Sequence, residues 1–237
     1  MRLDKLLANM GYGSRKDVKA LMKKKLVTVN DAIAKDGSLH VEPEIDIVKV
    51  NENTVTYKKY IYLMMNKPQG VISATKDTRD RTVIDLLADE IKHFNPFPVG
   101  RLDKDTEGLL LITNDGELAH QLVSPNKNVG KTYFAKIQGK VTEEDVVEFR
   151  NGVILEDGYQ AKPAELTILS SDTISEIEVI ITEGKYHQVK RMFESVNKTV
   201  IYLQRLSMGS LKLDHSLALG DYRELNDVEL QYCLSLK

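Results

Sequence analysis

Apolar residues at the start of the chain recur at the spacing of an amphipathic helix. Leu3, Leu6, Leu7 and Met10 stand at positions i, i+3, i+4 and i+7, and Gly11 follows them. Residues three and four apart share one face of a helix, and glycine commonly follows the last helical turn. The pattern therefore predicts a short helix that ends near Gly11.

A second helix with a capped start is predicted directly afterwards. Ser14 is a typical N-cap residue, and Asp17 stands at the position where a capping box usually has Glu or Gln. Val18, Leu21 and Met22 have the spacing of a buried helix face. We therefore expect a helix that begins after Ser14 and packs through these three side chains.

Short apolar runs bounded by turn residues predict strands along the rest of the chain. We expect strands near residues 26–29, 41, 45–50, 60–65, 71–73, 109–112, 132–137, 165–169 and 177–182, a turn at 30–31, and helices over 82–91, 117–122 and 186–196. Strands and helices do not alternate regularly. This mixture favours an α+β fold with a mixed, mainly antiparallel sheet.

A polar stretch divides this pattern into two parts. Asn51–Thr54 carries no apolar side chain, and we predict it as a linker. The expected domains are a small N-terminal domain over residues 1–55 and a larger domain over residues 56–237.

Composition adds limits on location and cofactors. The chain has 237 residues, of which 42% are hydrophobic and 29% charged, as in ordinary globular proteins. No apolar run approaches the length of a membrane span, and Cys233 is the single cysteine. We therefore expect a cytoplasmic protein without a membrane partner or internal disulfide. One cysteine and five scattered histidines assemble no zinc-ligand spacing, so no metal is expected.

The net charge of −2 hides an uneven distribution of charged residues. Residues 1–25 contain eight Lys or Arg against two Asp, whereas residues 142–183 contain eleven acids against two bases. A run of charge is often only a solvated surface, but this excess is concentrated in one small domain, which favours nucleic-acid binding. The candidate RNA-binding residues are Arg2, Lys5, Arg15, Lys16, Lys19 and Lys23.

The segment Val99–Gly116 places a dense charged loop directly before a buried strand. Such a loop can hold a carboxylate rigidly at the edge of a core. Asp103, Asp105 and Glu107 begin like a calcium loop, but Asn114 stands where that loop needs a bidentate Glu. A salt-bridged loop is the plain alternative, and composition alone favours it.

Three N-terminal segments resemble the S4 domain, a small module that binds structured RNA. They are R-L-D-K-L-L-A at 2–8, G-S-R at 13–15 and V-T-V-N at 27–30. Many S4 domains continue with Asn-Gly, whereas this chain has Asn30-Asp31, which also suits a turn. The resemblance implies that the first domain binds RNA.

Four later segments resemble the RsuA/RluA-type pseudouridine synthases, in the order and approximate spacing of that family. They are N-K-P-x-G-V at 66–71, G-R-L-D-x-x-T-x-G-L-L-L at 100–111, K-T-Y at 131–133 and E-G-K-Y-H-Q-V-K-R-M-F at 183–193. An S4 domain in front of such a domain is the arrangement of the RsuA branch. Any one motif is weak evidence, but five in order are strong.

The resemblance implies the catalytic residues. The Asp of Arg-Leu-Asp falls on Asp103, the active-site tyrosine on Tyr133, and the basic partner of the Asp on Lys190, where members often carry Arg. Asp103 would act on C1′ as a nucleophile, stabilise positive charge on the sugar, or remove the C2′ proton, and the sequence leaves these routes open. Asp105 and Glu107 are assigned to the structure of the loop.

The same resemblance implies substrate contacts. Chemistry on a base requires that the base leaves the stack, and Arg101 would help to extrude it. The other candidate substrate-binding residues are Lys67, His187, Gln188 and Arg191. The family uses no cofactor.

The expected activity is therefore isomerisation of a uridine in ribosomal RNA by a monomer, with 16S rRNA or a small-subunit assembly particle as the first choice. Action on 23S rRNA is the alternative within the family. A non-catalytic RNA-binding or ribosome-assembly protein and a nucleoside or glycoside hydrolase are rivals from other classes. The combination of Asp103, Tyr133 and Lys190 with the basic N-terminal domain argues against both rivals.

Overall fold

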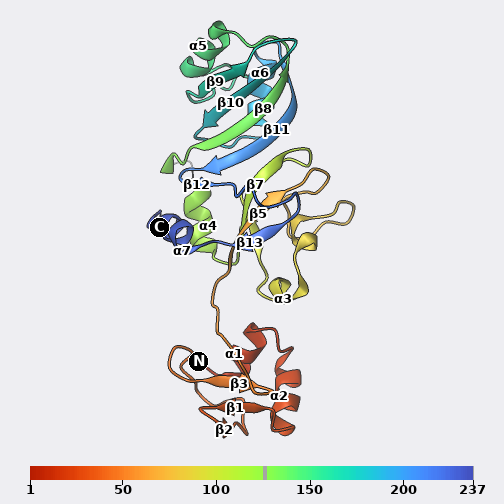
Figure 1. The fold of residues 1–237 in the computed structure, drawn as a ribbon, viewed down its shortest axis with the longest axis vertical. Coiled ribbons are helices and arrows are strands. Elements are labelled where there is room, and N and C mark those ends of the chain that lie inside the picture. Colours follow the sequence, from red (N-terminus) through yellow and green to blue (C-terminus); the bar gives the residue numbers. More distant parts are fainter. Residues whose placement is uncertain (125–126, 237) are drawn as a thin grey trace. The chain divides into compact units, whose positions relative to one another are not determined.

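A computed structural model describes residues 1–124 and 127–236, which form two compact units (Figure 1). Unit 1 comprises Met1–Ile61 and Ala88–Pro96, and unit 2 comprises Tyr62–Leu87 and the chain from Phe97 onward. The boundary predicted between residues 55 and 56 precedes this division. Each unit is described by itself.

Unit 1 contains the two predicted helices. α1 spans Leu3–Asn9, and α2 spans Arg15–Lys23. Ser14 caps α2 and forms the predicted capping box with Asp17. These bonds satisfy backbone donors that the first turn leaves without helical partners. The predicted helices and the cap are therefore confirmed.

Residues 1–61, all of them described, also contain a four-stranded antiparallel sheet in the order β2-β1-β3-β4. The strands are β1 Val27–Val29, β2 Ala32–Ile33, β3 Val48–Val50 and β4 Asn53–Thr54. The apolar faces of both helices and of this sheet form one buried cluster, which includes Leu3, Leu7, Val18 and Val27.

The predicted linker at Asn51–Thr54 is wrong. Asn51 and Glu52 have φ values of 51° and 65° and turn the chain from β3 into β4. Asn30 and Asp31, at 50° and 63°, make the corresponding turn between β1 and β2, as predicted. Two residues with positive φ match the twist of a hairpin, and Asn and Asp tolerate that conformation. Polarity in this stretch therefore reflects a turn.

In the described part of unit 2, nine strands form one sheet. Its order is β13-β5-β7-β11-β8-β10-β9, with β12 on β11 and β6 on β7. β7 and β11 are parallel, and the other pairs are antiparallel, which confirms the mixed, mainly antiparallel sheet. The strands are β5 Tyr62–Lys67, β6 Phe97–Val99, β7 Glu107–Thr113, β8 Lys131–Gln138, β9 Glu165–Ser170, β10 Ile174–Ile181, β11 Thr199–Met208, β12 Leu211–Lys212 and β13 Tyr222–Glu224.

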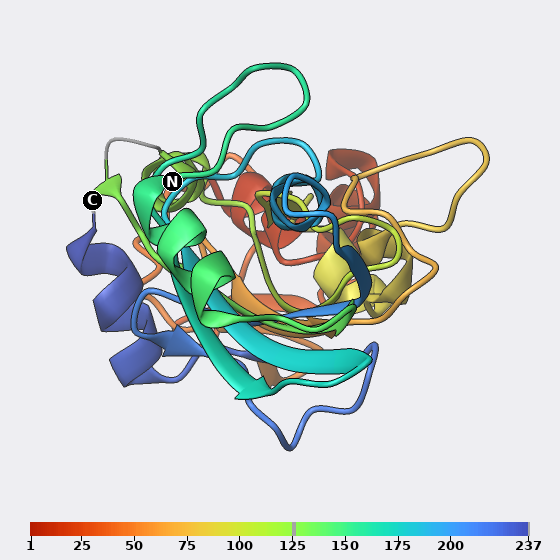
Figure 2. The ribbon, with the colours of Figure 1, turned by 90° about the horizontal axis from the view of Figure 1, so that it is seen from above.

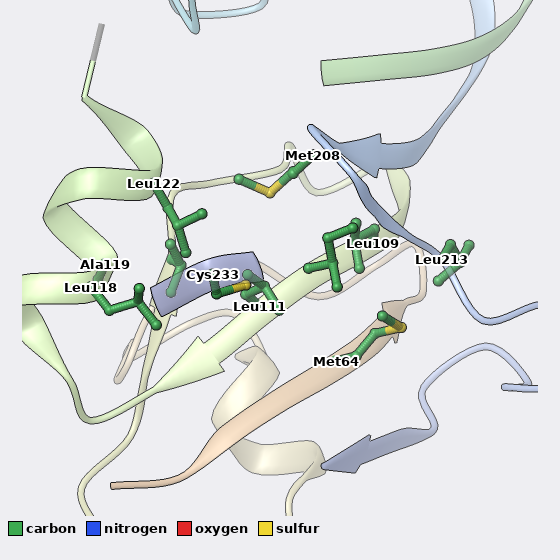
Figure 3. Close-up of a cluster of buried hydrophobic side chains, with 11 residues drawn as sticks. Met64, Leu109, Leu111, Leu118, Ala119, Leu122, Met208, Leu213 and Cys233 are labelled. Carbon is green, nitrogen blue, oxygen red and sulfur yellow. The ribbon is translucent and has the colours of Figure 1, made fainter. Parts of the chain in front are cut away.

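Helices cover two regions of this sheet. α4 (Gly116–Val123) and α7 (Asp227–Ser235) pack over β5 and β7 around a buried cluster that includes Leu109, Leu111 and Cys233 (Figure 3). α5 (Glu143–Asn151) and α6 (Gln188–Glu194) lie on the strands at the other end (Figure 2). The ring centroids of their Phe149 and Phe193 are 4.8 Å apart. No helix in the described ranges is long and apolar enough to cross a membrane.

Two predicted elements of this region differ from the structure. The helix expected over 82–91 is interrupted at Leu87, whose extended backbone separates a 3-10 turn, η1 (Val83–Leu86), from the short α3 (Asp89–Lys92). The strand expected over 71–73 makes only a single bridge, between Ile72 and Thr82.

Candidate active site

Asp103 lies in the loop of residues 100–106, between β6 and β7, and a buried lysine holds this loop from below. Lys67 has no exposed surface, and its Nζ donates to the carbonyl oxygens of Pro68 at 3.0 Å, Asp103 at 2.9 Å and Thr106 at 2.8 Å. Burial lowers the pKa of Lys67 to about 8, against the charges of Asp103 and Asp105, which raise it. All three ammonium hydrogens are thus used on backbone.

The segment 70–73 holds the same loop from its side. Ser73 Oγ donates to the Leu102 carbonyl at 2.9 Å and accepts from the Leu102 amide at 3.0 Å. The Gly70 amide donates to the Lys104 carbonyl at 2.8 Å. Together with the hydrogen bonds of Lys67, these bonds fix the backbone on both sides of Asp103, and the Asp103 side chain lines the pocket.

Gly108, at the start of β7, allows the backbone that follows the loop to approach β11 closely. Its φ is 102°, and a Cβ there would meet the carbonyl oxygen of Arg205 at 2.3 Å. β7 and β11 pair at this point, with Gly108 opposite Arg205. A side chain would therefore push β7 away from β11 and move the Asp103 loop with it.

The loop of residues 100–106 is the first wall of the pocket, and residues 183–188 are the second wall, which a buried carboxylate holds in place. Glu183 Oε1 accepts from the Lys162 amide at 2.9 Å and from Gln188 Nε2 at 2.5 Å, and Oε2 accepts from the Tyr159 hydroxyl at 2.7 Å. Gln188 Oε1 in turn accepts from the Lys185 amide at 2.8 Å. His187 precedes α6 in the left-handed conformation, with φ of 48°. This wall is therefore also tied at both ends.

The two walls line an open pocket in the surface of unit 2. Lys190 Nζ lies 3.4 Å from Asp103 Oδ2, and His187 Nε2 lies 3.7 Å from Asp103 Oδ1. Tyr133, buried on β8 opposite Arg205 of β11, contributes to the lining. The pocket thus presents one carboxylate with a cation, an imidazole and an aromatic ring.

Lys190 forms ion pairs with both Asp103 and Asp105, and its contacts with Asp105 are the shorter ones. Its Nζ lies 2.6 Å from Asp105 Oδ1 and 2.9 Å from Oδ2. Burial opposes the charge on Lys190, but its hydrogen bond to Asp105 and the charge of Asp103 outweigh burial and raise the pKa of Lys190. Burial likewise opposes the charge on Asp105, yet the bond to Lys190 leaves the pKa of Asp105 lowered. The cation is therefore held charged beside Asp103.

Glu107 points elsewhere, to the Tyr202 hydroxyl at 2.7 Å. Burial, together with this bond, raises the pKa of Tyr202. The three acids that open like a calcium loop therefore have separate partners: the pocket for Asp103, Lys190 for Asp105 and Tyr202 for Glu107. Ion-paired and hydrogen-bonded acids account for the charge density of the loop.

Most of the sequence-predicted site residues lie together. The pocket is lined by Asp103, Tyr133, Lys190, Arg101, His187 and Gln188. Two predicted substrate-binding residues are not placed there. Arg191 pairs with Asp157 at 2.5 Å, and Lys67 lies under the loop with its donors on carbonyl oxygens. In this arrangement Lys67 contacts the protein backbone, not a substrate.

Sequence reasoning assigned no role to Glu183, Ser73 or Thr106, which build or line the site. Glu183 opens the quoted motif at 183–193, and Thr106 lies within the one at 100–111, so both had a signal. Ser73 had none, because its partner Leu102 is distant in sequence. Thr106 is buried, and its Oγ1 has no hydrogen-bond partner among the described residues.

Five basic residues of unit 1 line a hollow in its surface, together with the acids Asp4 and Asp36. Of the candidate RNA-binding residues, Arg2, Arg15, Lys19 and Lys23 line it, together with Lys35, which was not predicted. Lys5 and Lys16 are exposed but lie outside the lining. Arg2 also makes a bidentate pair with Asp4, at 3.0 and 2.7 Å.

Comparison with known proteins agrees with both units. The profile of the family described as RNA pseudouridylate synthase matches residues 61–195, and that of the S4 domain matches residues 1–47. An uncharacterized RNA pseudouridine synthase of Bacillus subtilis, YtzG, is 54% identical over 97% of each chain. A structure described as pseudouridylate synthase covers 98% of this chain and 99% of its own, with 32% identity and a TM-score of 0.69.

Two further relatives carry names that specify a ribosomal subunit. A ribosomal small subunit pseudouridine synthase A of Vibrio cholerae is 38% identical over 97% of this chain and 98% of its own. A ribosomal large subunit pseudouridine synthase B of Bacillus subtilis is also 38% identical, over 97% of this chain and 94% of its own. The relatives therefore agree on the reaction named and differ in the subunit.

Proposed function

The chain belongs to the RNA pseudouridylate synthase family, with an S4 domain in front, and we propose that it converts a uridine of 16S ribosomal RNA to pseudouridine with Asp103 as the catalytic residue. The observation that carries the proposal is the Asp103 carboxylate in a pocket with Lys190, His187 and Tyr133. The protein acts as a cytoplasmic monomer, without a cofactor, on the RNA or a small-subunit assembly particle.

The reaction needs what this pocket contains. The N1–C1′ bond of uridine breaks, the uracil turns, and C5 bonds to C1′. The C5 hydrogen leaves as a proton and N1 takes up a proton, so the product is an isomer of uridine. A carboxylate facing C1′ assists departure of the base as a nucleophile, by stabilising positive charge on the sugar, or by removing the C2′ proton. All three routes begin from an ionised Asp103, and Lys190 Nζ lies 3.4 Å from its Oδ2. The Tyr133 ring stacks on the flipped uracil.

The decisive test is the variant Asp103→Asn. The amide keeps the size of the side chain but removes the negative charge, so pseudouridine formation falls below detection while RNA affinity stays within about threefold of the wild type. Turnover is counted as tritium released from ribosomal RNA labelled at uracil C5, taken from cells that lack the protein. Retained turnover in this variant contradicts the role of Asp103.

The target is tested by mapping pseudouridine in the ribosomal RNA of cells with and without the protein. We expect one 16S position to lose the modification in the deleted cells and to regain it with wild-type protein but not with Asp103→Asn. Loss at a 23S position instead assigns the large subunit, the alternative that the 38% identical relative named for that subunit favours. Loss at neither contradicts action on ribosomal RNA.

Unit 1 supplies RNA affinity through the basic hollow. Each lysine that neutralises a phosphate releases counterions, so the double variant Lys19→Gln, Lys23→Gln weakens RNA binding and lowers the slope of log K against log salt by about 2. Turnover at saturating RNA is unchanged, because both residues lie outside the pocket. An unchanged salt slope contradicts phosphate contacts at these two positions.

A further inference from the structure

Tyr186 is a large aromatic residue that the fold leaves in solvent at the rim of the pocket. It is 74% exposed, although it lies between Lys185 and His187, both of which line the pocket. Its ring stacks on the His187 imidazole, with centroids 3.8 Å apart and planes inclined by 17°. That imidazole is in turn 3.7 Å from the Asp103 carboxylate. The Tyr186 ring therefore lies two side-chain contacts from the catalytic group.

The position of this ring is fixed by the backbone beneath it. His187 adopts φ of 48°, a conformation that costs free energy for a residue with a Cβ and is retained only where the surroundings hold it. The holding contacts are those of Gln188 with the Lys185 amide and with buried Glu183. Tyr186 is thus a preordered aromatic surface, whose ordering precedes any contact with RNA.

The surroundings of the ring are those of a nucleic-acid contact. Arg101 and Lys185, both exposed, line the pocket, and Lys185 precedes Tyr186 in the chain. Exposed aromatic rings next to cations form stacking surfaces for single-stranded bases, because every base has a π face. When a uridine is flipped into a pocket, the base next to it loses its stacking partner. A ring at the rim can replace that partner.

We propose that Tyr186 stacks on the base that flanks the flipped uridine and so holds the RNA strand open at the pocket. The proposal rests on the proposed function, because it assumes a flipped uridine at Asp103. Tyr186 is then a substrate-binding residue that recognises an unstacked nucleobase of RNA. It contributes to binding and leaves the chemical step to Asp103.

Steady-state kinetics test the stacking directly. The substrate is ribosomal RNA tritiated at uracil C5 from cells that lack the protein, and turnover is tritium release. Tyr186→Leu keeps an apolar side chain but has no aromatic face, so KM rises about tenfold while kcat stays within about twofold. Tyr186→Phe keeps the ring, so its KM stays within about twofold. An unchanged KM in Tyr186→Leu, or an equal loss in Tyr186→Phe, overturns the proposal.

Fluorescence gives a readout that does not depend on turnover. The chain contains no tryptophan, so Tyr186→Trp introduces a single reporter at the rim. Stacking of a base on the indole quenches its emission when ribosomal RNA is added. The matched control is Val228→Trp on α7, a position 80% exposed and outside the pocket lining, where RNA leaves the emission unchanged. Equal emission changes in the two variants overturn the proposal.

The two measurements separate failure of this proposal from failure of the proposed function. If the wild-type protein releases no tritium but the Trp at position 186 is quenched, the proposed reaction fails and the base contact stands. If tritium release is normal and neither KM nor emission responds at position 186, the reaction stands and the stacking role fails.

Discussion

Two buried charges of opposite sign hold the two walls of the pocket. Lys67 has no exposed surface and donates to three backbone carbonyl oxygens, two in the first wall at Asp103 and Thr106 and one at Pro68. Glu183, 5% exposed, accepts from one backbone amide and two side chains of the second wall. A buried charge is tolerated when each of its hydrogen-bonding positions has a partner. Lys67 finds its partners on backbone alone, whereas Glu183 finds two of its three partners on side chains.

The difference between them lies in how directly each reaches Asp103. Lys67 bonds the carbonyl of Asp103 itself, whereas Glu183 reaches the pocket through Gln188 and the Lys185 amide. Loss of Lys67 therefore moves the carboxylate, and loss of Glu183 moves the residues that face it. The comparison predicts that the first wall is the more sensitive to substitution.

The largest effect is expected from Lys67→Met. The unbranched apolar side chain fills similar space but leaves the carbonyls of Pro68, Asp103 and Thr106 without the ammonium donor. A displacement of about 1 Å costs about 100-fold in rate, so kcat falls about 100-fold while KM stays within about threefold. The measurement is tritium release with ribosomal RNA. A large rise in KM with normal kcat contradicts this role and restores Lys67 as a substrate-binding residue.

A smaller effect is expected from Glu183→Gln. Glutamine keeps one oxygen for the donors of Lys162 and Gln188, but it carries no charge, and its NH2 group replaces the oxygen that accepts from the Tyr159 hydroxyl. Hydrogen bonds to charged groups contribute about 1.5–3 kcal/mol, against about 1 kcal/mol for neutral ones, so kcat/KM falls about tenfold as residues 183–188 loosen. Thermal unfolding and tritium release are measured together. Tyr159→Phe, which removes one bond and leaves the Glu183 carboxylate in place, is the milder control.

The sequence identified the charged positions of the site better than their partners. Asp103, Lys190 and Tyr133 stand in motifs whose order is visible in the chain, and the structure brings them into one pocket. The contacts that hold them are non-local. The hydrogen bond from Ser73 to Leu102 joins residues 29 apart in sequence, and that from Lys67 to Asp103 joins residues 36 apart. A local sequence pattern does not reveal such pairs. Lys67 was therefore predicted to bind substrate, whereas its hydrogen bonds go to backbone carbonyl oxygens.

The fold shows the same division between local and non-local information. α1 and α2 follow from apolar spacing and a cap, and both are confirmed. The sequence pattern did not reveal β11, although it lies near the centre of the unit 2 sheet. Two register shifts in its pairing with β8 break the alternation of buried and exposed positions, and buried Arg205 lies within it. α5 was missed because its first turn carries three acids and little of it is apolar.

The pH dependence of stability isolates the buried lysine. Its pKa is about 8 in the folded protein and 10.5 ordinarily, so between these values the unfolded chain binds more protons at this position. The contribution of Lys67 to the free energy of unfolding therefore rises as pH increases from about 8 to 10.5 and is lost as pH falls back through that range. The difference in free energy of unfolding between wild type and Lys67→Met, measured with urea at each pH, gives this contribution, since the other groups titrate equally in both proteins. Parallel curves across this range contradict the lowered pKa.

The smallest effect is expected from Asp105→Asn, and this variant sharpens the comparison within the first wall. Asp105 has the shorter contacts with Lys190, but its side chain is 67% exposed, against 29% for Asp103. Exposed ion pairs contribute less than about 1 kcal/mol, and the asparagine oxygen still accepts from Lys190, so kcat changes by no more than about threefold. Lys190→Met, which leaves Asp103 without its cation, loses more. If Asp105→Asn instead abolishes tritium release as Asp103→Asn does, the reacting carboxylate is shared between the two positions and the first wall presents a pair of acids.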